Sequence, residues 1–384
     1  MIVFVLYVCA YVPEDSNAAF YLLDKQLAHY FPSWEARFDS TNGGLRTSQG
    51  CLDLRNWYID LTTRYEVYLS KLLGLRYRNR YLGDYDDHIS NHYFEPFFQL
   101  GENCRFFLTI APHYYKGEDE IGTGIFFGRN YLNYLETFIV VEDFDRNFSL
   151  KNINPGPEKI LYKQHPIELN STYNTYWKTG HLKVTLALTN RYRLQSTEPW
   201  ESWPPAHTEE GLRRCFYTRL WQDIKNLRIG GIIDFKQSEH SKLDTLSYHS
   251  EDILEIIAEP VITYRLHKKW IPSLYLSYNY KTEDDSVHYL DAIQDSVVHY
   301  QRDIYAYLID VAFHPGGNFV WHLGMQRQFY YNNTGEEFRE RRLILGFEYR
   351  YKNMWFYFVE AMEGDFPTPK WLHNHTYVHL LLTF

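Results

Sequence analysis

Three arginines, Arg76, Arg78 and Arg80, stand two residues apart in one short stretch of this sequence. Side chains two apart on a β-strand point to the same face, so these guanidinium groups would form a ladder. Rings of charged side chains set the ion selectivity of pores, and basic rings favour anions. We therefore predict that the ladder lines a water-filled interior. The same prediction covers the basic residues that recur later in the chain, which are Lys183, Arg191, Arg193, Arg342, Arg350 and Lys352.

These basic residues also have a purely structural interpretation. A charge inside a protein must be hydrated or paired, because an isolated buried charge is prohibitively costly. Carboxylates such as Glu348 and Glu360 could pair with the basic set and merely hold the wall together. The formal net charge of −9 further weakens the expectation of anion preference. Both interpretations require an interior face, which the surrounding elements must supply.

A different chemistry is suggested by His88, Ser90 and Asn91. A histidine and a serine two apart on a strand point the same way, as a general base and a nucleophile must. The three residues resemble the His-x-Ser-Asn motif of outer-membrane phospholipases, and Asn103 stands near the place of that family's further Asn. However, His92 replaces the usual glycine, and Asn103 falls in a predicted turn at the other end of the strand. A lipid hydrolase using His88 and Ser90 is therefore an alternative hypothesis.

No other chemistry-bearing motif is visible. There is no Gly-rich phosphate loop, no cofactor fingerprint and no Cys spacing typical of a metal or haem site. The acidic stretches at 83–88 and 283–286 do not have the spacing of a calcium loop. We therefore expect no cofactor, no metal and no conventional enzyme. The four cysteines are Cys9, Cys51, Cys104 and Cys215.

The elements that carry these residues read as β-strands, because apolar and polar residues alternate with period two from about Cys51 onward. In 181–192, for example, Leu182, Val184 and Leu186 alternate with more polar neighbours. Similar strands are expected at 74–82, 261–266, 273–281, 304–314, 319–328, 342–352 and 355–360. In a membrane barrel the apolar set faces lipid and the polar set faces a wet lumen.

Short and long connections alternate along the chain. Short turns are predicted near 71–74, 101–103, 129–131, 178–180, 225–226, 267–270, 315–317 and 351–353. Longer polar connections are predicted at 83–88, 115–120, 146–162, 195–211, 237–252, 282–302, 332–337 and 365–370. This asymmetry is typical of outer-membrane barrels, which have tight periplasmic turns and long outer loops. The count is about 16 strands from Gly74, or about 18 if 51–61 and 62–72 form a first hairpin.

The last strand strengthens this interpretation. Val378, Leu380, Leu382 and the terminal Phe384 form one apolar face. This arrangement resembles the closing strand of Gram-negative outer-membrane β-barrels. The resemblance covers about residues 50–384 and implies the outer membrane of a Gram-negative bacterium, with membrane lipid and lipopolysaccharide as partners. Composition agrees with it, because a polar chain with 35 Tyr and 10 Trp suits a barrel with aromatic girdles.

The amino-terminal part differs from the rest. Residues 1–10 are apolar and end in a small residue, like the back half of a signal peptide, although a basic start is missing. Residues 11–49 form an N-terminal extension, in which apolar groups at helical spacing predict a short amphipathic helix over Asn17–Phe31. The outer-membrane barrel is expected to occupy 50–384.

Together these patterns predict an all-β protein. We expect a transmembrane antiparallel up-and-down β-barrel of about 16–18 strands with a short N-terminal helical extension. Its expected function is a porin-like channel for passive diffusion of small hydrophilic solutes or ions, and it could form a homo-oligomer. The acidic net charge argues against a nucleic-acid partner. Besides the lipid hydrolase, the alternatives are a non-conducting barrel that sheathes a partner protein and a soluble aromatic-rich β protein.

Overall fold

A computed structural model shows the fold and describes most of the chain after residue 40. The predicted signal peptide, the predicted helix and the terminal Phe384 lie outside the described residues. In the described part, no helix is long and apolar enough to cross a membrane. The described residues are 41, 43–53, 56–83, 88–112, 120–141, 159–164, 166–197, 207–244, 247–289, 296–363 and 372–383.

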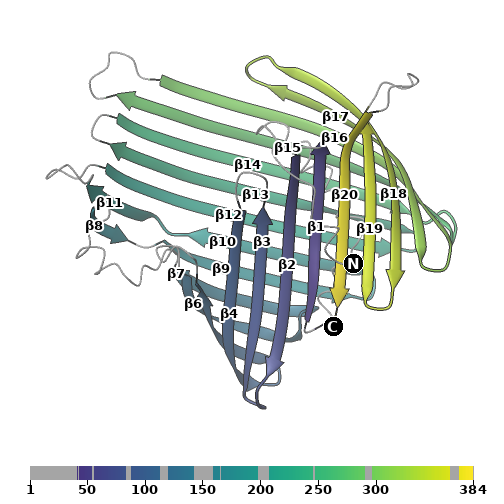
Figure 1. The fold of residues 1–384 in the computed structure, drawn as a ribbon, viewed down its shortest axis with the longest axis horizontal. Coiled ribbons are helices and arrows are strands. Elements are labelled where there is room, and N and C mark those ends of the chain that lie inside the picture. Colours follow the sequence, from purple (N-terminus) through teal and green to yellow (C-terminus); the bar gives the residue numbers. More distant parts are fainter. Residues whose placement is uncertain are drawn as a thin grey trace.

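These residues form antiparallel strands that pair with their neighbours along the chain (Figure 1). The first ten are β1 (Gly43–Asp53), β2 (Asn56–Tyr68), β3 (Leu73–Gly83), β4 (His88–Gly101), β5 (Cys104–Ala111), β6 (Glu120–Asn130), β7 (Asn133–Val141), β8 (Lys159–Gln164), β9 (Ile167–Trp177) and β10 (Gly180–Thr189). The others are β11 (Tyr192–Thr197), β12 (His207–Ile224), β13 (Leu227–Asp244), β14 (Ser247–Tyr264), β15 (Trp270–Tyr289), β16 (Ser296–Gly316), β17 (Phe319–Asn332), β18 (Glu337–Tyr351), β19 (Met354–Glu363) and β20 (Leu372–Thr383).

The sheet closes on itself and forms an 18-strand barrel. β20 pairs with both β19 and β1, so neither end of the described sheet leaves a free edge. β8 and β9 are two parts of one interrupted strand, and so are β10 and β11, because their pairing register continues across the break. At the break, the side-chain oxygen of Asn190 accepts a hydrogen bond from the backbone N–H of Ile167 at 2.6 Å. The larger of the two predicted strand numbers is therefore correct.

The outer face of the barrel carries an apolar band of membrane thickness. On β14 every outward residue from Leu254 to Tyr264 is apolar, and Ile262 and Tyr264 are each 45% exposed. The next outward residue, Asp252, is charged. A membrane-spanning β-strand needs about 9–11 residues, which matches this stretch. A closed barrel with an even number of strands, an apolar exterior and a charged interior is the outer-membrane type, so the chain spans the outer membrane of a Gram-negative cell.

The eight short turns all lie at the end of the barrel where β20 finishes. The backbone N–H of Thr383, near the chain end, bonds the carbonyl of Asn353 in the β18–β19 turn at 3.0 Å. The turns span residues 69–72, 102–103, 131–132, 178–179, 225–226, 265–269, 317–318 and 352–353. Each falls at or within a few residues of its predicted place, and this end faces the periplasm by the rule that periplasmic turns are short.

Several predicted boundaries are wrong. β1 begins at Gly43, ahead of the predicted barrel start at residue 50, and the first hairpin turns after Asp53 instead of at 61–62. The connections predicted at 237–252 and 282–302 are mostly strand. β13 ends only at Asp244 and β14 begins at Ser247, and likewise β15 ends at Tyr289 and β16 begins at Ser296. Beyond the lipid these strands no longer need an apolar outer face, so their sequence lacks the alternating pattern and resembles that of a loop.

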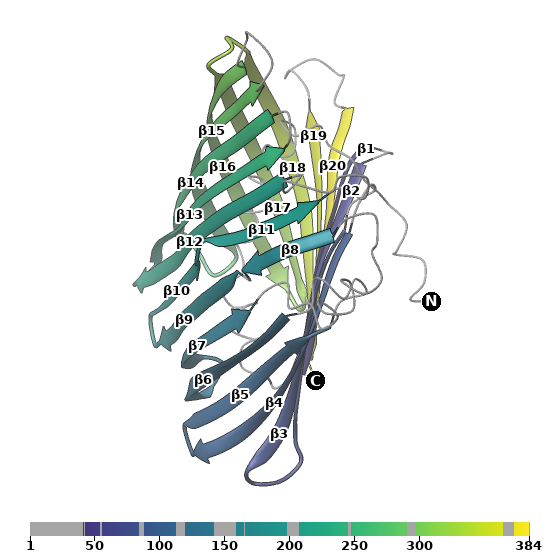
Figure 2. The same ribbon diagram turned by 90° about the vertical axis from the view of Figure 1, so that its left-hand side faces the viewer.

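The long strands β12–β16 form one inclined wall of the barrel. They run at a steep angle to β1–β3 and β20, which make up the opposite wall (Figure 1). Figure 2 shows these two walls facing each other, with β4–β7 between them on one side. The inward residues of these walls form the candidate functional site.

Candidate functional site

The inward face between β2 and β7 is filled by paired charges. Arg76 is 4% exposed and donates hydrogen bonds to Glu95, which is fully buried, and to Glu136 at 2.5 Å. Arg78 also donates to Glu95, with its Nε 2.9 Å from Oε2. The hydroxyl of Thr109 donates to the same carboxylate at 3.2 Å. Glu95 is thus the shared acceptor of two arginines that the sequence places on one face of β3.

A second layer of pairs lies beside the first. Arg105 donates to Glu66 at 2.9 Å, and the hydroxyl of Tyr131 donates to the other oxygen of Glu66 at 2.5 Å. The guanidinium of Arg105 lies over the Phe126 ring, 4.9 Å from its centroid. Phe97, Phe107, Phe126 and Tyr131 form a buried aromatic cluster around these charges. We call this region, from Glu66 on β2 to Glu136 on β7, the packed sector.

The packed sector closes part of the interior. Its contacts join residues up to 65 positions apart in the chain, such as Glu66 and Tyr131. β3 and β7 are not neighbours in the sheet, so Arg76 and Glu136 meet only because the wall curves around this sector. Arg76 and Arg78, predicted to line a water-filled interior, are instead bonded to carboxylates here, as the alternative structural interpretation requires.

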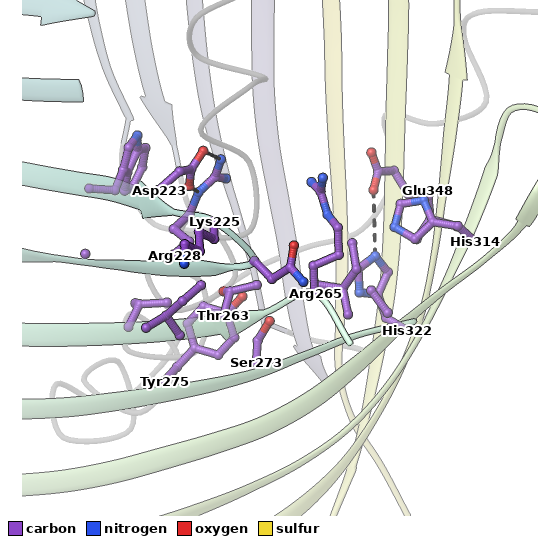
Figure 3. Close-up of a pocket in the computed structure, with 18 of the residues that line it drawn as sticks. Asp223, Lys225, Arg228, Thr263, Arg265, Ser273, Tyr275, His314, His322 and Glu348 are labelled. Carbon is purple, nitrogen blue, oxygen red and sulfur yellow. Dashed lines mark hydrogen bonds and ion pairs between the residues drawn. The ribbon is translucent and has the colours of Figure 1, made fainter. Parts of the chain in front are cut away.

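A recess of about 310 Å³ lies on the other side of the interior, at the short-turn end (Figure 3). Its walls come from β12 to β18, with Trp221, Thr263, Ser273 and Tyr275 on the long inclined strands. The basic residues on its wall are Lys225, Arg228, Arg265 and Arg350, and the acidic ones are Asp223 and Glu348, with His314 and His322 beside them. Fully ionised, the arginines, lysine and carboxylates leave this recess with a positive balance.

Two of these arginines are oriented by carboxylates. Arg228 forms a bidentate pair with Asp223, with N–O distances of 2.5 and 2.7 Å. Arg350 bonds Glu348, and its guanidinium lies 4.2 Å from the centroid of the Trp355 ring. Bidentate and stacked arginines hold a fixed orientation, so their outer N–H groups are presented to the recess in a defined way.

His322 links the recess to the wall behind it. Its Nδ1 lies 3.3 Å from an oxygen of Asp310, and its Nε2 lies 3.7 Å from Glu348. Figure 3 shows the imidazole turned towards Glu348, which also bonds Arg350. Asp310, His322 and Glu348 are all nearly inaccessible, so this chain of groups fixes the rim of the recess.

The structure distributes the remaining predicted lining residues differently. Lys183 shares the inward face of β10 with the buried His181 and Thr189. Arg342 faces inward but is only 2% exposed, and it donates to Gln326 at 3.2 Å. The backbone of Arg80 lies in β3, but its side chain is outside the described part. Lys352 is not on the wall, because it is an exposed residue of the β18–β19 turn with φ of 45°.

Arg191 and Arg193 lie on the outward face, contrary to the predicted inward ladder. The interruption at Asn190 changes the alternation, so that Arg193 stands directly opposite Glu210 and pairs with it at 3.4 Å. Glu210 belongs to the same face of β12 as the lipid-facing Leu220, which is 48% exposed. A break in the period-two pattern cannot be seen from the spacing of the arginines alone.

Sequence reasoning missed Arg228, Arg265, His314 and His322. Arg228 and His314 stand on inward positions within a few residues of a short turn, and Arg265 is the first residue of the turn 265–269, where the recess opens. They could have been found by asking which residues near a predicted short turn occupy the inward, alternate positions of their strands. The spacing of basic residues along one strand does not reveal them.

The predicted hydrolase residues are not brought together. His88, Ser90 and Asn91 lie at the start of β4, and their side chains are outside the described part. Asn103 lies in the β4–β5 turn, at the opposite end of the strand from His88. The register places Ser90 opposite Tyr81, near the end of β4 that is remote from the turn containing Asn103.

The predicted closing residues lie at the seam of the barrel. Leu382, Leu380 and Val378 alternate along β20 and stand opposite residues of β1 on one side and β19 on the other. Leu381, between them, is fully buried on the inward face. The residues of this predicted signature that the structure describes are thus in the strand that closes the sheet.

Comparison with known proteins gives no match by sequence, neither to a family model nor to a curated protein. Among solved structures, a loop-deletion mutant of OmpT, an outer membrane protein of Vibrio cholerae, is 11% identical, with a TM-score of 0.38 over 88% of this chain and 97% of its own. CdiB from Acinetobacter baumannii is 8% identical, with a TM-score of 0.42 over 90% of this chain and 60% of its own. The translocator domain of the autotransporter NalP from Neisseria meningitidis is 8% identical, with a TM-score of 0.37 over 96% and 98%.

Proposed function

We propose that this barrel is a channel for passive diffusion of small hydrophilic solutes or ions across the outer membrane. The observation that carries the proposal is the positively balanced recess at the periplasmic mouth, formed by inward residues of β12 to β18. Barrels with this number of strands are wide enough to hold a water-filled lumen. Because the packed sector fills the interior between β2 and β7, the aqueous path follows the opposite wall.

Charge in the recess supports a preference for small anions. Lys225, Arg228, Arg265 and Arg350 outnumber Asp223 and Glu348 on its surface. A narrow passage with excess positive charge raises the local concentration of anions, because low-dielectric walls focus the field. The preference follows from charges that face the lumen, so the acidic net charge of the whole chain does not oppose it.

The test is the current through single refolded proteins in a planar bilayer under a salt gradient. We expect discrete conductance steps and a reversal potential of the sign that marks anion preference. Arg265→Glu should move the reversal potential towards cations, because it reverses one lumen charge. Arg339→Glu is the matched control, since Arg339 is an exposed residue on the outward face of β18 and should leave the potential unchanged.

Folding and conduction must be measured on the same samples. The folded barrel is identified by its heat-dependent mobility on a denaturing gel. Protein that is folded and inserted but passes no current would refute the open channel. A reversal potential that responds equally to Arg265→Glu and Arg339→Glu would remove the recess from the conducting path.

A further inference from the structure

The short-turn end of the barrel is strongly basic, although the chain is acidic overall. The eight turns contain a single acidic residue, Glu102. Their basic residues are Lys71, Lys178, Lys225, Arg265, Lys268, Lys269 and Lys352, and all seven are exposed. The sequence segments that join the opposite strand ends have the reverse composition, with fifteen Asp and Glu against five Lys and Arg. The charge is therefore divided between the two ends.

The basic turn residues are next to the periplasmic edge of the apolar band. Lys178 directly follows Trp177, which is 41% exposed, and Lys269 directly precedes Trp270, which is 45% exposed. The ammonium of Lys352 lies 5.2 Å from the ring centroid of Tyr351. Aromatic rings of this kind occupy the membrane–water interface, and neighbouring lysines extend their ammonium groups to the headgroup level. Lys71 likewise adjoins the exposed Leu72.

The distribution of these charges distinguishes lipid from protein as the partner. Apart from Lys225 and Arg265, which line the recess, the basic turn residues lie in four turns, which join β2 to β3, β9 to β10, β14 to β15 and β18 to β19. They are thus spread around the closed sheet instead of being gathered in one patch. A protein partner would need a contiguous surface, whereas lipid headgroups surround the whole circumference at this level.

We infer that Lys71, Lys178, Lys268, Lys269 and Lys352, which we call the short-turn rim, bind the phosphate-bearing headgroups of anionic phospholipids in the periplasmic leaflet. The ligand class is a phospholipid with net negative charge, such as phosphatidylglycerol, held by lysine ammonium groups beside a girdle of aromatic and aliphatic side chains. Anionic membrane surfaces attract basic residues in this way over about a Debye length. Lys225 and Arg265 line the recess, whereas Lys71, Lys178, Lys268, Lys269 and Lys352 do not. The inference is independent of the channel function, because these five lysines act on the lipid outside the barrel whether or not the lumen conducts.

The test measures the lipid shell of the refolded full chain in phosphatidylcholine vesicles. Spin-labelled phosphatidylglycerol and spin-labelled phosphatidylcholine are added separately, and the immobilised fraction of each gives their relative association with the protein. We expect a severalfold preference for phosphatidylglycerol at low salt that declines at high salt, as exposed charges are screened.

The rim is tested with the triple variant Lys178→Gln, Lys268→Gln, Lys352→Gln, which alters three different turns. Its preference for phosphatidylglycerol should decrease at least twofold. The matched control is Lys183→Gln, Lys242→Gln, Lys281→Gln, which removes the same charge from inward positions of β10, β13 and β15. This control should keep the preference of the unmodified protein.

Two results would overturn the inference. One is an equal loss of preference in the rim variant and the control, which would make net charge, and not the rim, responsible. The other is no preference for phosphatidylglycerol together with salt-sensitive binding of polyglutamate that the rim variant loses. That result would assign the rim to an acidic protein. Both variants are checked for folding by gel mobility, so that misfolding is not mistaken for either result.

Discussion

At the scale of single residues, the most consequential group is Glu95. It is fully buried and bonds Arg76, Arg78 and Thr109, so two arginines share one carboxylate inside the packed sector, and Arg76 pairs with Glu136 as well. Buried pairs add little net stability compared with apolar packing, but removal of one partner leaves the other charged and unpaired. The sector is therefore much more sensitive to the loss of its acids than to the loss of an equal number of surface charges.

Glu95→Gln should destabilise the barrel by about 3–5 kcal/mol, the usual cost of breaking a buried ion pair. The free energy of unfolding in vesicles, followed by tryptophan fluorescence in urea, measures this. Glu102→Gln is the control, because Glu102 is exposed in a short turn, and it should change stability by less than about 0.5 kcal/mol. A comparable loss in both variants would mean that the packed sector does not hold the wall.

The arginines show which features of single residues the sequence could predict. Arg76 and Arg78 were correctly assigned to the inward face by their spacing, because strand parity depends only on neighbours in sequence. Their partner Glu136 is 60 positions from Arg76, and only the curvature of the closed wall brings the two together. The pairing with Glu136 was therefore inaccessible from the sequence, as was the reversal of face at Asn190.

At the scale of elements, β13–β15 continue well beyond the apolar band. On their outward side Glu239, Asp252 and Asp284 stand directly opposite one another, and we call them the outer row. Like charges directly opposite on neighbouring strands are destabilising. Partial burial, with the carboxylates of Glu239 and Asp284, raises the pKa of Asp252 above its ordinary value. The row lies beyond the apolar band, where Glu239 pairs with Arg191 at 3.3 Å and Asp284 bonds His299.

Asp252→Asn should stabilise the protein by about 0.2–1 kcal/mol at neutral pH, because the middle charge of the outer row disappears. A carboxyl whose pKa is higher in the folded than in the unfolded state takes up protons on folding, so its destabilising effect is present above the folded pKa. The effect is lost as the pH falls below the unfolded pKa. Urea unfolding at neutral and acidic pH tests this, and a stability difference that persists at acidic pH would contradict it.

Strand prediction succeeded where lipid imposes an apolar stripe and failed elsewhere. β17, with its alternation of exposed and buried residues, begins at the predicted Phe319 and continues four residues past the predicted end at Gln328. β1 was missed before Cys51 because Gly43, Gly44 and Gly50 and polar residues interrupt the pattern. The sequence predicts loops where β13–β16 extend beyond the lipid, because hydrogen bonding between strands continues there without any hydrophobic signature.

At the scale of the whole molecule, closure depends on the seam between β1 and β20. Leu45 stands opposite Leu382 in this seam, and the pairing continues from Gly44 to Cys51. A barrel avoids exposed sheet edges only if this last pairing forms. The seam therefore decides whether the chain is one closed wall or an open sheet.

Cysteines at 45 and 382, introduced into a chain whose native cysteines are replaced by serine, should form a disulfide on mild oxidation. Directly opposite residues have Cβ atoms about 4.5–5.5 Å apart, whereas diagonal ones are about 7–8 Å apart. The altered mobility of the unreduced protein on a gel reports the bond. The diagonal pair Leu45→Cys, Leu380→Cys should react much less, and equal reaction of both pairs would disprove the register.

The extensions of β12–β16 have a consequence for anything that approaches the cell from outside. On β14, the part beyond the apolar band runs from Ser247 to Ile253, which at about 3.3 Å per residue is roughly 20 Å of paired strand. A phage or antibody that binds from outside would therefore contact a stiff β-sheet surface on this side of the molecule. Insertions or deletions of residues that abolish binding of the phage or antibody would be restricted there, because a change in the length of one strand must be matched by its paired neighbours.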